Sequence, residues 1–241
     1  MSICLLLFAN SIAEDYLYIT LDRLKQFFPK IKSYMGIDSS ITLNKLNKFY
    51  TFDEIIIYNQ SDTWTKKMNY ILSFIKEDYV FLLIDNNIFV DIFSEEKLNL
   101  YINTIVRNNI DQLRMLPSAV TLPSISNKDN IYKNNESSYV FSVQPAIWKK
   151  STLIDIMEKF LNVDYREIEL TATPYAIKFN NYFIYTEKDI EYNEKNFSFG
   201  CPVIHALTFG KWVNESEFYK KCLDHIFKEY SVKNNRKFLL D

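Results

Sequence analysis

The 241-residue chain has the composition of an ordinary globular protein, with 24% charged and 48% hydrophobic residues, which excludes a disordered chain and a fibrous repeat. Its formal net charge of −2 at pH 7 supplies no concentrated positive field for phosphate backbones, so nucleic acid is not an expected partner. We expect one domain over residues 1–241, in which residues 232–241 form a frayed tail.

Glycine and cysteine usage excludes several kinds of site. With only 3 glycines, the sequence contains neither a G-x-G-x-x-G fingerprint nor a P-loop. Its three cysteines, Cys4, Cys201 and Cys222, include no C-x-x-C pair, so a disulfide framework and a zinc knuckle are not expected. This usage is typical of a reducing compartment, and we expect a cytoplasmic protein. No run approaches the roughly 20 apolar residues that cross a bilayer, so we expect no integral membrane protein.

The first predicted element is a buried strand. Residues Ile3–Ala9 form a continuous apolar run that ends at Asn10, as is typical of a central parallel strand covered on both faces. The same run resembles the apolar region of a signal peptide, but no basic residue precedes it and Glu14 follows closely. We therefore expect a strand rather than a cleaved signal.

Strand and helix patterns then alternate through the first half of the chain. Trp64, Met68 and Ile71, for example, share one face at helical spacing. The expected elements are a helix over residues 16–28, a strand over 54–58, a helix over 63–76, a strand over 79–84 and a helix from Ser94 to about 106. Such alternation predicts an α/β fold, Rossmann-like, with a mostly parallel central sheet flanked by helices.

The second half is less regular. We expect a strand over 112–116, a polar surface loop over 124–138, an extended segment over 139–144, a turn over 145–148, a helix from Ser151 to about 160, a hairpin of strands 175–179 and 181–185, and a helix over 215–230. Ligands of such folds bind at the carboxyl ends of the parallel strands.

Asp85 is the most informative polar residue, because it follows the apolar strand Val80–Ile84 directly, where a parallel sheet opens to its ligand. Carboxylate oxygens suit Mg²⁺ or Mn²⁺, and such an ion on a diphosphate would offset the charge of a departing nucleotide. We expect Asp85 to contact a ligand or a metal ion. The alternative is an aspartate that only closes a turn before Phe89.

The segment Tyr79–Asn87 resembles the strand and D-x-D region of GT-A glycosyltransferases. Further segments occur in an order similar to that in bacterial and viral polysaccharide glycosyltransferases, namely Ser61–Trp64, Leu113–Pro117, Gln144–Trp148 and Gly210–Trp212. The resemblance covers most of the chain and lies in the joint order of these segments. It implies a GT-A fold, a nucleotide-diphosphate sugar donor, a glycan or other hydroxyl acceptor, and a divalent cation (Mn²⁺ or Mg²⁺).

The sequence departs from that pattern where the further acidic residues of the D-x-D region are expected, because Asn86 and Asn87 stand there. An ion held by Asp85 and Asn87 would be bound weakly and would depend on the donor phosphates. Metal dependence therefore stays open. The same departure motivates a rival function, a nucleotide-sugar-binding or interaction module that has lost catalysis.

Other donor-binding residues are implied by the resemblance. Phe8, Asn10 and Ser11, at the end of the first strand, would lie against the nucleotide base and ribose, with Asp62 nearby. Lys211 is a candidate diphosphate contact, as a point charge. Turn and cap chemistry is the alternative for Asn10 and Asp62. A nucleotidyltransferase is a weaker rival, because residues 10–14 offer no basic, glycine-containing loop.

Direct displacement at an anomeric carbon needs a general base for the acceptor hydroxyl. Glu167 and Glu169 follow the segment Gln144–Trp148 at the place where the similar enzymes have an acidic residue facing the acceptor. At most one of the two is expected to point into the cleft, and a solvated acidic face is the alternative. His205 and His225 belong to no catalytic pattern, and we expect structural roles for both. For His205 the alternative is a contact with the diphosphate or a metal ion, since imidazole is a competent ligand.

Overall fold

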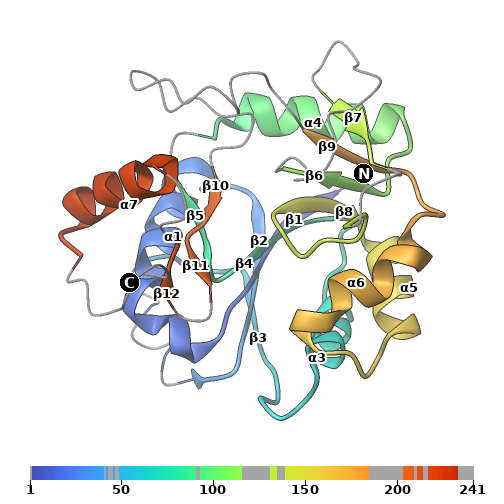
Figure 1. The fold of residues 1–241 in the computed structure, drawn as a ribbon, viewed down its shortest axis with the longest axis horizontal. Coiled ribbons are helices and arrows are strands. Elements are labelled where there is room, and N and C mark those ends of the chain that lie inside the picture. The colour runs from blue at the N-terminus through green and yellow to red at the C-terminus, as the bar shows by residue number, and fades with distance from the viewer. Residues whose placement is uncertain are drawn as a thin grey trace.

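The computed structural model describes residues 2–40, 42, 46, 49–90, 93–115, 131–134, 139–184, 203–208, 211–213 and 217–232. Its centre is an eight-stranded sheet of order β3-β2-β1-β4-β8-β6-β9-β7 (Figure 1). The strands are β1 Ile3–Phe8, β2 Lys32–Ile37, β3 Glu54–Ile57, β4 Tyr79–Ile84, β6 Gln112–Arg114, β7 Ile131–Lys133, β8 Ala146–Lys149 and β9 Asn181–Ile184.

Most neighbouring strands of this sheet run in one direction. β3, β2, β1 and β4 are mutually parallel, and β6 is parallel to β9. β8 is antiparallel to both β4 and β6, and β7 is antiparallel to β9. The mostly parallel central sheet expected from the sequence is thus confirmed, with one reversed strand between its two parallel parts.

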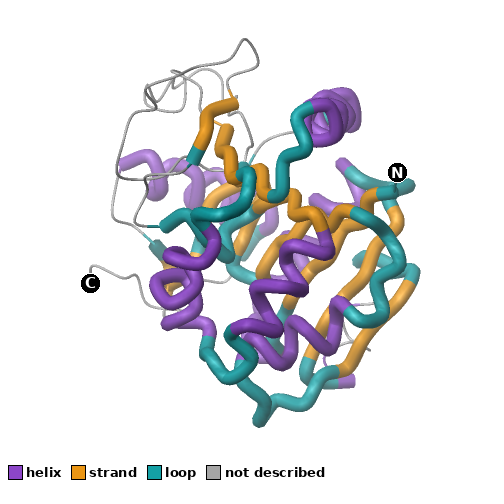
Figure 2. Tube along the Cα trace, turned by 90° about the vertical axis from the view of Figure 1, so that its right-hand side faces the viewer, coloured by secondary structure: helices purple, strands orange, loops and turns teal. Residues whose placement is uncertain are grey.

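Helices cover both faces, as expected. They are α1 Glu14–Phe27, α3 Trp64–Leu72, α4 Glu95–Arg107, α5 Lys150–Lys159, α6 Tyr165–Ala176 and α7 Glu217–Tyr230, and a 3₁₀ turn, η1 Ser11–Ala13, precedes α1. Side chains of α1, α4 and α7 pack with Leu5, Leu7 and Phe81. Those of α3, α5 and α6 pack on the opposite face with Leu6 and Val80. Figures 1 and 2 show the two helix layers with the sheet between them.

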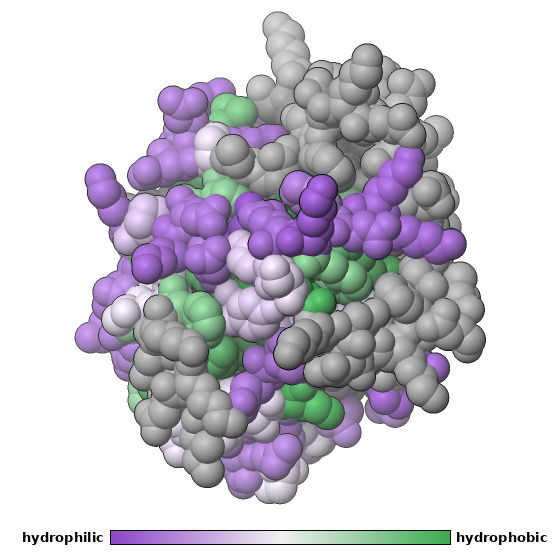
Figure 3. Space-filling view, turned by 90° about the vertical axis from the view of Figure 1, so that its left-hand side faces the viewer, coloured by the Kyte–Doolittle hydropathy of each residue, from purple (hydrophilic) through white to green (hydrophobic). Residues whose placement is uncertain are grey.

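The outer surface over α1 and α7 is largely hydrophilic. Figure 3 shows polar side chains on this face, with the hydrophobic ones in small separate groups. The apolar stripes of these helices point inward instead, because Leu17 and Leu24 of α1 and Leu223 of α7 are buried in the core. None of the helices in the described ranges is long and apolar enough to cross a membrane.

Two small antiparallel ladders bring the late part of the chain to the end of β4. β5 Asn87–Phe89 pairs with β10 Val203–His205, and β11 Leu207–Thr208 pairs with β12 Lys211–Trp212. The backbone N–H of Ala206 donates to the Asn86 carbonyl at 2.8 Å. Residues distant in sequence therefore surround the turn that follows β4.

β2 was not expected from the sequence. Ser33 and Gly36 interrupt its apolar run, yet the strand lies between β1 and β3 with its middle buried. Gly36 packs closely against α3, because a Cβ added there would overlap the end of the Ile71 side chain, which would have to shift. Gly36, which interrupts the apolar pattern of β2, thus lets α3 approach the sheet closely.

Several expectations for the second half were wrong. Residues 146–149, expected as part of a turn, form β8, and Pro145 immediately precedes that strand, where a proline costs no ladder hydrogen bond. Residues 139–144 are irregular rather than extended. The expected loop over 124–138 contains β7, and its other residues except Asn134 lie outside the described part of the chain.

The expected hairpin around Asn180 was also wrong. α6 continues to Ala176, and β9 pairs with β6 and β7 instead. Ser151 does not cap α5 but lies in its first turn, after the N-cap Lys149. Such long-range pairings depend on contacts that local periodicity does not encode. The expected tail over 232–241 lies outside the described residues, apart from Val232.

Candidate functional site

Polar groups gather where β1, β2 and β4 end. Asn10 and Ser11 follow β1, Asp38 follows β2, and Asp85 follows β4. One Asp85 carboxylate oxygen accepts a hydrogen bond from the backbone N–H of Asn10 at 2.9 Å. The Asp38 carboxylate accepts from the Ser11 backbone N–H at 2.7 Å and from its hydroxyl at 3.1 Å. We call this arrangement, the Asn10–Ser11 turn between two carboxylates, the carboxyl edge.

Tyr58, the first residue after β3, lies against the same edge. Its hydroxyl donates to the Ala9 carbonyl oxygen at 2.6 Å, and its ring stacks on Phe8 with centroids 5.1 Å apart. Burial, together with the Asp38 and Asp85 carboxylates, raises the pKa of Tyr58. The phenol therefore stays neutral and keeps donating.

Phe8 was expected to lie against a nucleotide base. Its ring is only 8% exposed and lies between Tyr58 and Trp64, whose centroid is 5.9 Å away. The ring is thus part of the core, and the backbone that follows it forms the accessible part of the edge.

The turn after β4 fixes the direction of Asp85. The Asp85 N–H donates to the Phe8 carbonyl at 2.9 Å. Asn87 is fully buried, its side-chain oxygen accepts from the Ile84 N–H at 2.9 Å, and its amide donates to Asn86 at 3.3 Å. Asn87, expected as a metal ligand, thus uses that oxygen to close the turn.

The site offers few ligands for a cation. Within the described ranges, no group of three or more Asp, Glu, His or Cys side chains is placed to hold a metal ion. Asp85 and Asp38 are hard oxygen donors of the kind that Mg²⁺ and Mn²⁺ prefer. The residues therefore fit such an ion only when further oxygens come from a bound ligand.

The second side of the site is the beginning of α6. The Tyr165 ring meets Trp64 edge to face at 5.9 Å. Burial, Glu169 and, more weakly, Asp85 raise the pKa of Tyr165, and a hydrogen bond with the Asn86 side chain lowers it in part. Tyr165 therefore connects α6 to the turn that carries Asp85.

The helix decides between the two candidate bases. Glu169 is half-buried, and one of its carboxylate oxygens accepts from the Ser142 hydroxyl at 2.7 Å and from the Val143 N–H at 2.8 Å. Glu167, two residues earlier on the same helix, is exposed. Residues two apart on a helix face different directions. Glu169 therefore points inward and Glu167 points to solvent.

Arg114, at the end of β6, binds residues 139–144, the segment that contains Ser142 and Val143. Its side chain is 3% exposed, and it donates to the Tyr139 carbonyl at 3.0 Å and to the Gln144 side-chain oxygen. Burial lowers the pKa of Arg114 to about 10, while Glu169 raises it. Arg114 and Glu169 thus fix residues 139–144 from two sides.

The remaining candidates lie in separate surroundings. Asp62 lies in the turn before α3, where its backbone N–H donates to the Asn59 carbonyl at 3.2 Å. Lys211 is half-buried at the start of β12, in the segment attached to Asn86. His225 is on α7, 3.5 Å from Glu229, and the His205 side chain lies outside the described part.

The sequence reasoning missed Asp38, Tyr58, Tyr165 and Arg114 as site residues. Asp38 was missed because its strand was missed, and the rule that selected Asp85, an acid directly after a buried parallel strand, would have found it. Tyr165 and Arg114 reach the site only through tertiary packing, for which the sequence carries no local signal.

No protein-family model and no curated protein sequence matches the chain. Among solved structures, the chain is similar to S. aureus TarS, with 14% identity, 77% of this chain and 37% of that chain covered, and a TM-score of 0.49. TarS residues 1–349 in complex with UDP-GlcNAc share 12% identity over 80% of this chain and 62% of that chain, with a TM-score of 0.48.

A cytidylyltransferase from Leptospira borgpetersenii is also similar, with 15% identity, 99% of each chain covered and a TM-score of 0.48. The chain spans little more than a third of the first of these TarS chains. All three TM-scores lie below 0.5. At these TM-scores the neighbours say nothing about the reaction.

Proposed function

We propose that the protein binds a nucleotide-diphosphate sugar at the carboxyl edge and transfers the sugar to a glycan or another hydroxyl acceptor. The observation that carries the proposal is the pair of carboxylates, Asp38 and Asp85, fixed on either side of the Asn10–Ser11 turn. The edge lies at the carboxyl ends of parallel strands, where α/β sheets bind ligands.

The two carboxylates suit two parts of such a donor. In the proposal, Asp38 and the Ser11 hydroxyl face the nucleoside, because a carboxylate accepts hydrogen bonds from ribose hydroxyls and base N–H groups. Asp85 faces the diphosphate, and Lys211 adds a positive charge there. A divalent cation bound with the donor would screen Asp85 from the phosphates and stabilise the leaving nucleotide.

Glu169 is the proposed general base. The two donors on one of its oxygens, Ser142 and Val143, hold the carboxylate in one orientation. A base held in this way takes the proton of the acceptor hydroxyl while the hydroxyl oxygen of the acceptor attacks the anomeric carbon. The bond to the nucleotide phosphate breaks in the same step. Glu167 points away and serves as the matched control.

A thermal-shift panel tests donor binding, because a ligand that binds only the folded state raises its melting temperature. We would titrate uridine, cytidine and guanosine diphosphates and their sugar conjugates, with and without Mn²⁺. Asp38→Ala should weaken the shift with or without Mn²⁺, and Asp85→Ala should weaken it when Mn²⁺ is present. Asp224→Asn, an exposed position on α7, should leave it unchanged. If no nucleotide stabilises the folded wild-type protein, the donor site is wrong.

The second candidate is a nucleotide-sugar-binding module without turnover. It is favoured by Asn87, whose side-chain oxygen is engaged with Ile84 rather than turned to a ligand. Binding of a donor without release of free nucleotide, across a panel of hydroxyl acceptors, would select this module. Release of pyrophosphate from CTP and a sugar would instead identify a nucleotidyltransferase.

A further inference from the structure

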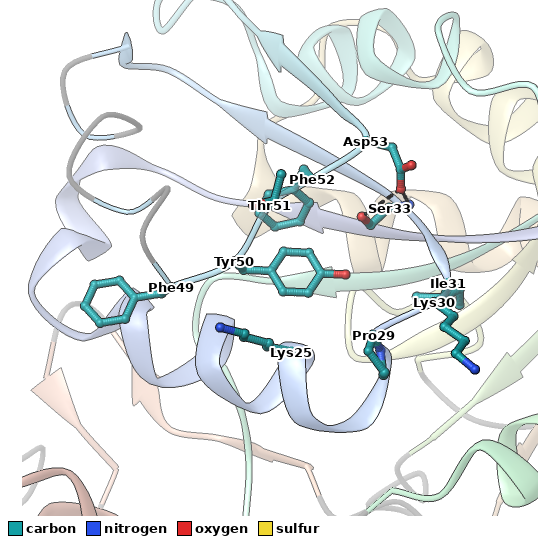
Figure 4. A pocket seen from close by; sticks show the side chains of 10 residues that line it. All are labelled: Lys25, Pro29, Lys30, Ile31, Ser33, Phe49, Tyr50, Thr51, Phe52 and Asp53. Atoms are coloured by element: carbon teal, nitrogen blue, oxygen red, sulfur yellow. Dashed lines mark hydrogen bonds between the residues drawn. The ribbon is translucent and has the colours of Figure 1, made fainter.

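A pocket lies at the other end of the parallel strands, away from the carboxyl edge. It has a volume of about 470 Å³ and is formed by the end of α1, the turn into β2 and the segment that leads into β3. Its lining residues are Lys25, Pro29, Lys30, Ile31, Ser33 and residues 49–53 (Figure 4). We call it the amino-end pocket, since Ser33 is at the start of β2 whereas Asp38 follows its end.

Aromatic rings form one side of this pocket. Tyr50 and Phe52 lie edge to face with centroids 4.7 Å apart, and Phe49 packs on Tyr18 of α1 at 5.5 Å. Figure 4 shows the Tyr50 hydroxyl pointing into the space between Pro29 and Ser33. Its contact with the Phe28 carbonyl is long, at 3.5 Å. The same hydroxyl also has a hydrogen bond with the Ser33 side chain, so a ligand bound there would have to replace both contacts.

The charge in the pocket is positive. Its single carboxylate, Asp53, is already engaged, because it accepts from the Ser33 N–H at 2.8 Å and lies 3.4 Å from the Lys32 ammonium. The Ser33 N–H is the main cause of the lowered pKa of Asp53, and Lys32 adds to it. Neither Lys25 nor Lys30 forms an ion pair within the part of the chain that the structure describes. Two ammonium groups outweigh the roughly half-unit negative charge at the end of α1.

We propose that the amino-end pocket binds an anionic saccharide, a sugar unit that carries a phosphate or a carboxylate. The size is that of small-molecule sites, about 300–1,000 Å³. Lys25 and Lys30 lie at opposite ends of the pocket in Figure 4, and each offers a point charge to an anionic group at its own end. The apolar C–H face of the sugar ring lies on the Tyr50 and Phe49 side, and sugar hydroxyls bond to Tyr50, Thr51 and Asp53. The proposal is independent of donor binding at the carboxyl edge.

Two sources supply this chemistry: a free sugar phosphate, or a charged unit within a glycan chain. Calorimetric titration of the full chain would use glucose 6-phosphate, glucose, inorganic phosphate and a tetrasaccharide that contains glucuronate. Glucose 6-phosphate should bind at least ten times more tightly than glucose or phosphate, because ring and charge contribute together. Tighter binding of the tetrasaccharide would identify the glycan as the source, and tighter binding of glucose 6-phosphate would identify the free sugar phosphate.

The variants separate this pocket from the carboxyl edge. The double change Lys25→Gln and Lys30→Gln should weaken binding of the preferred probe at least tenfold, and binding to wild type should fall as salt is added. The matched control, Lys66→Gln with Lys76→Gln, removes two exposed lysines elsewhere and should have no effect. Asp85→Ala should also leave this binding unchanged.

Three results would overturn the proposal. The first is that neither glucose 6-phosphate nor the tetrasaccharide binds the wild-type protein. The second is that the Lys25 and Lys30 double variant, shown to be folded by its melting temperature, binds as tightly as wild type. The third is that inorganic phosphate binds as tightly as glucose 6-phosphate, since the sugar ring then contributes nothing.

Discussion

The two ends of the parallel strands differ in charge. At the carboxyl edge, Asp38 and Asp85 present two carboxylates held by backbone N–H groups. At the amino-end pocket, the one carboxylate is paired with Lys32 while Lys25 and Lys30 remain. Under the two proposals, an anion enters the pocket directly, whereas Asp85 repels a diphosphate at the carboxyl edge unless a cation screens it. The two ends of one sheet thus present opposite charges to an anionic ligand.

The largest effect that sharpens this comparison is expected at Glu169. Glu169→Gln keeps an acceptor for Ser142 and Val143 but removes the base, so turnover should fall by about 10²–10⁴-fold while donor binding is retained. Initial rates and a donor titration measure the two effects. Glu167→Gln, on the exposed side of α6, should retain activity. Equal losses in both variants would contradict the assignment of the base.

The two edge carboxylates should separate by their dependence on Mn²⁺. Asp38→Asn is expected to weaken donor binding by about 10- to 100-fold with or without Mn²⁺, because it removes a charged hydrogen-bond partner worth about 1.5–3 kcal/mol. Asp85→Asn should weaken binding only when Mn²⁺ is present. Calorimetric titration with and without chelator measures both, and the same metal response in the two variants would break the proposed division.

Gly36→Ala tests whether the two ends are independent. The new methyl would overlap Ile71, and such overpacking costs about 1–3 kcal/mol of unfolding free energy. Because Gly36 lies two residues before Asp38, donor binding should weaken as well. Urea unfolding gives the stability loss, and Gly36→Ser should act in the same direction. Saccharide binding at the amino-end pocket should be unaffected, and a parallel loss there would show that the ends are coupled.

The smallest effect concerns the buried phenols. Tyr34 has a pKa raised to about 12 by burial and Glu77, and the pKa of Tyr58 is raised as well. Because the folded state holds these protons more tightly, their stabilisation is complete below about pH 10, the ordinary tyrosine pKa, and is lost at higher pH. Tyr58→Phe should cost about 1 kcal/mol at pH 8 and flatten the decline between pH 10 and 12. Urea unfolding at pH 8, 10 and 12 measures this. An unchanged slope of unfolding free energy against pH in Tyr58→Phe would contradict it.

The first half of the fold was predictable because most of its elements have a clear local pattern of apolar residues. β1 and β4 are continuous apolar runs, and α3 and α4 show apolar faces at helical spacing. β2 was missed because Ser33 and Gly36 break its run. The reversed strand β8 was missed for a different reason, since its partners β4 and β6 are identified only by pairing across the sheet.

The site residues that could be predicted are those that follow the predicted strands. Asp85 and the Asn10–Ser11 turn follow strands that were expected, and they lie together in the structure. Asp38 was lost with its strand. The choice between Glu167 and Glu169 depended on α6 and on its contact with residues 139–144, and no spacing in the sequence specifies that contact.

The reversed strand β8 has a consequence for how the two reactants could be recognised. Because β8 runs against β4 and β6, the chain enters it at the same border where they end. In the proposed function, residues that follow strands thus form the nucleotide side, while residues 139–144, which lead into a strand, form the side next to Glu169. The two halves of the site belong to separate stretches of chain. If the proposed function holds, insertions or substitutions in residues 139–144 would alter the choice of acceptor while Asp38 and Asp85 keep their positions.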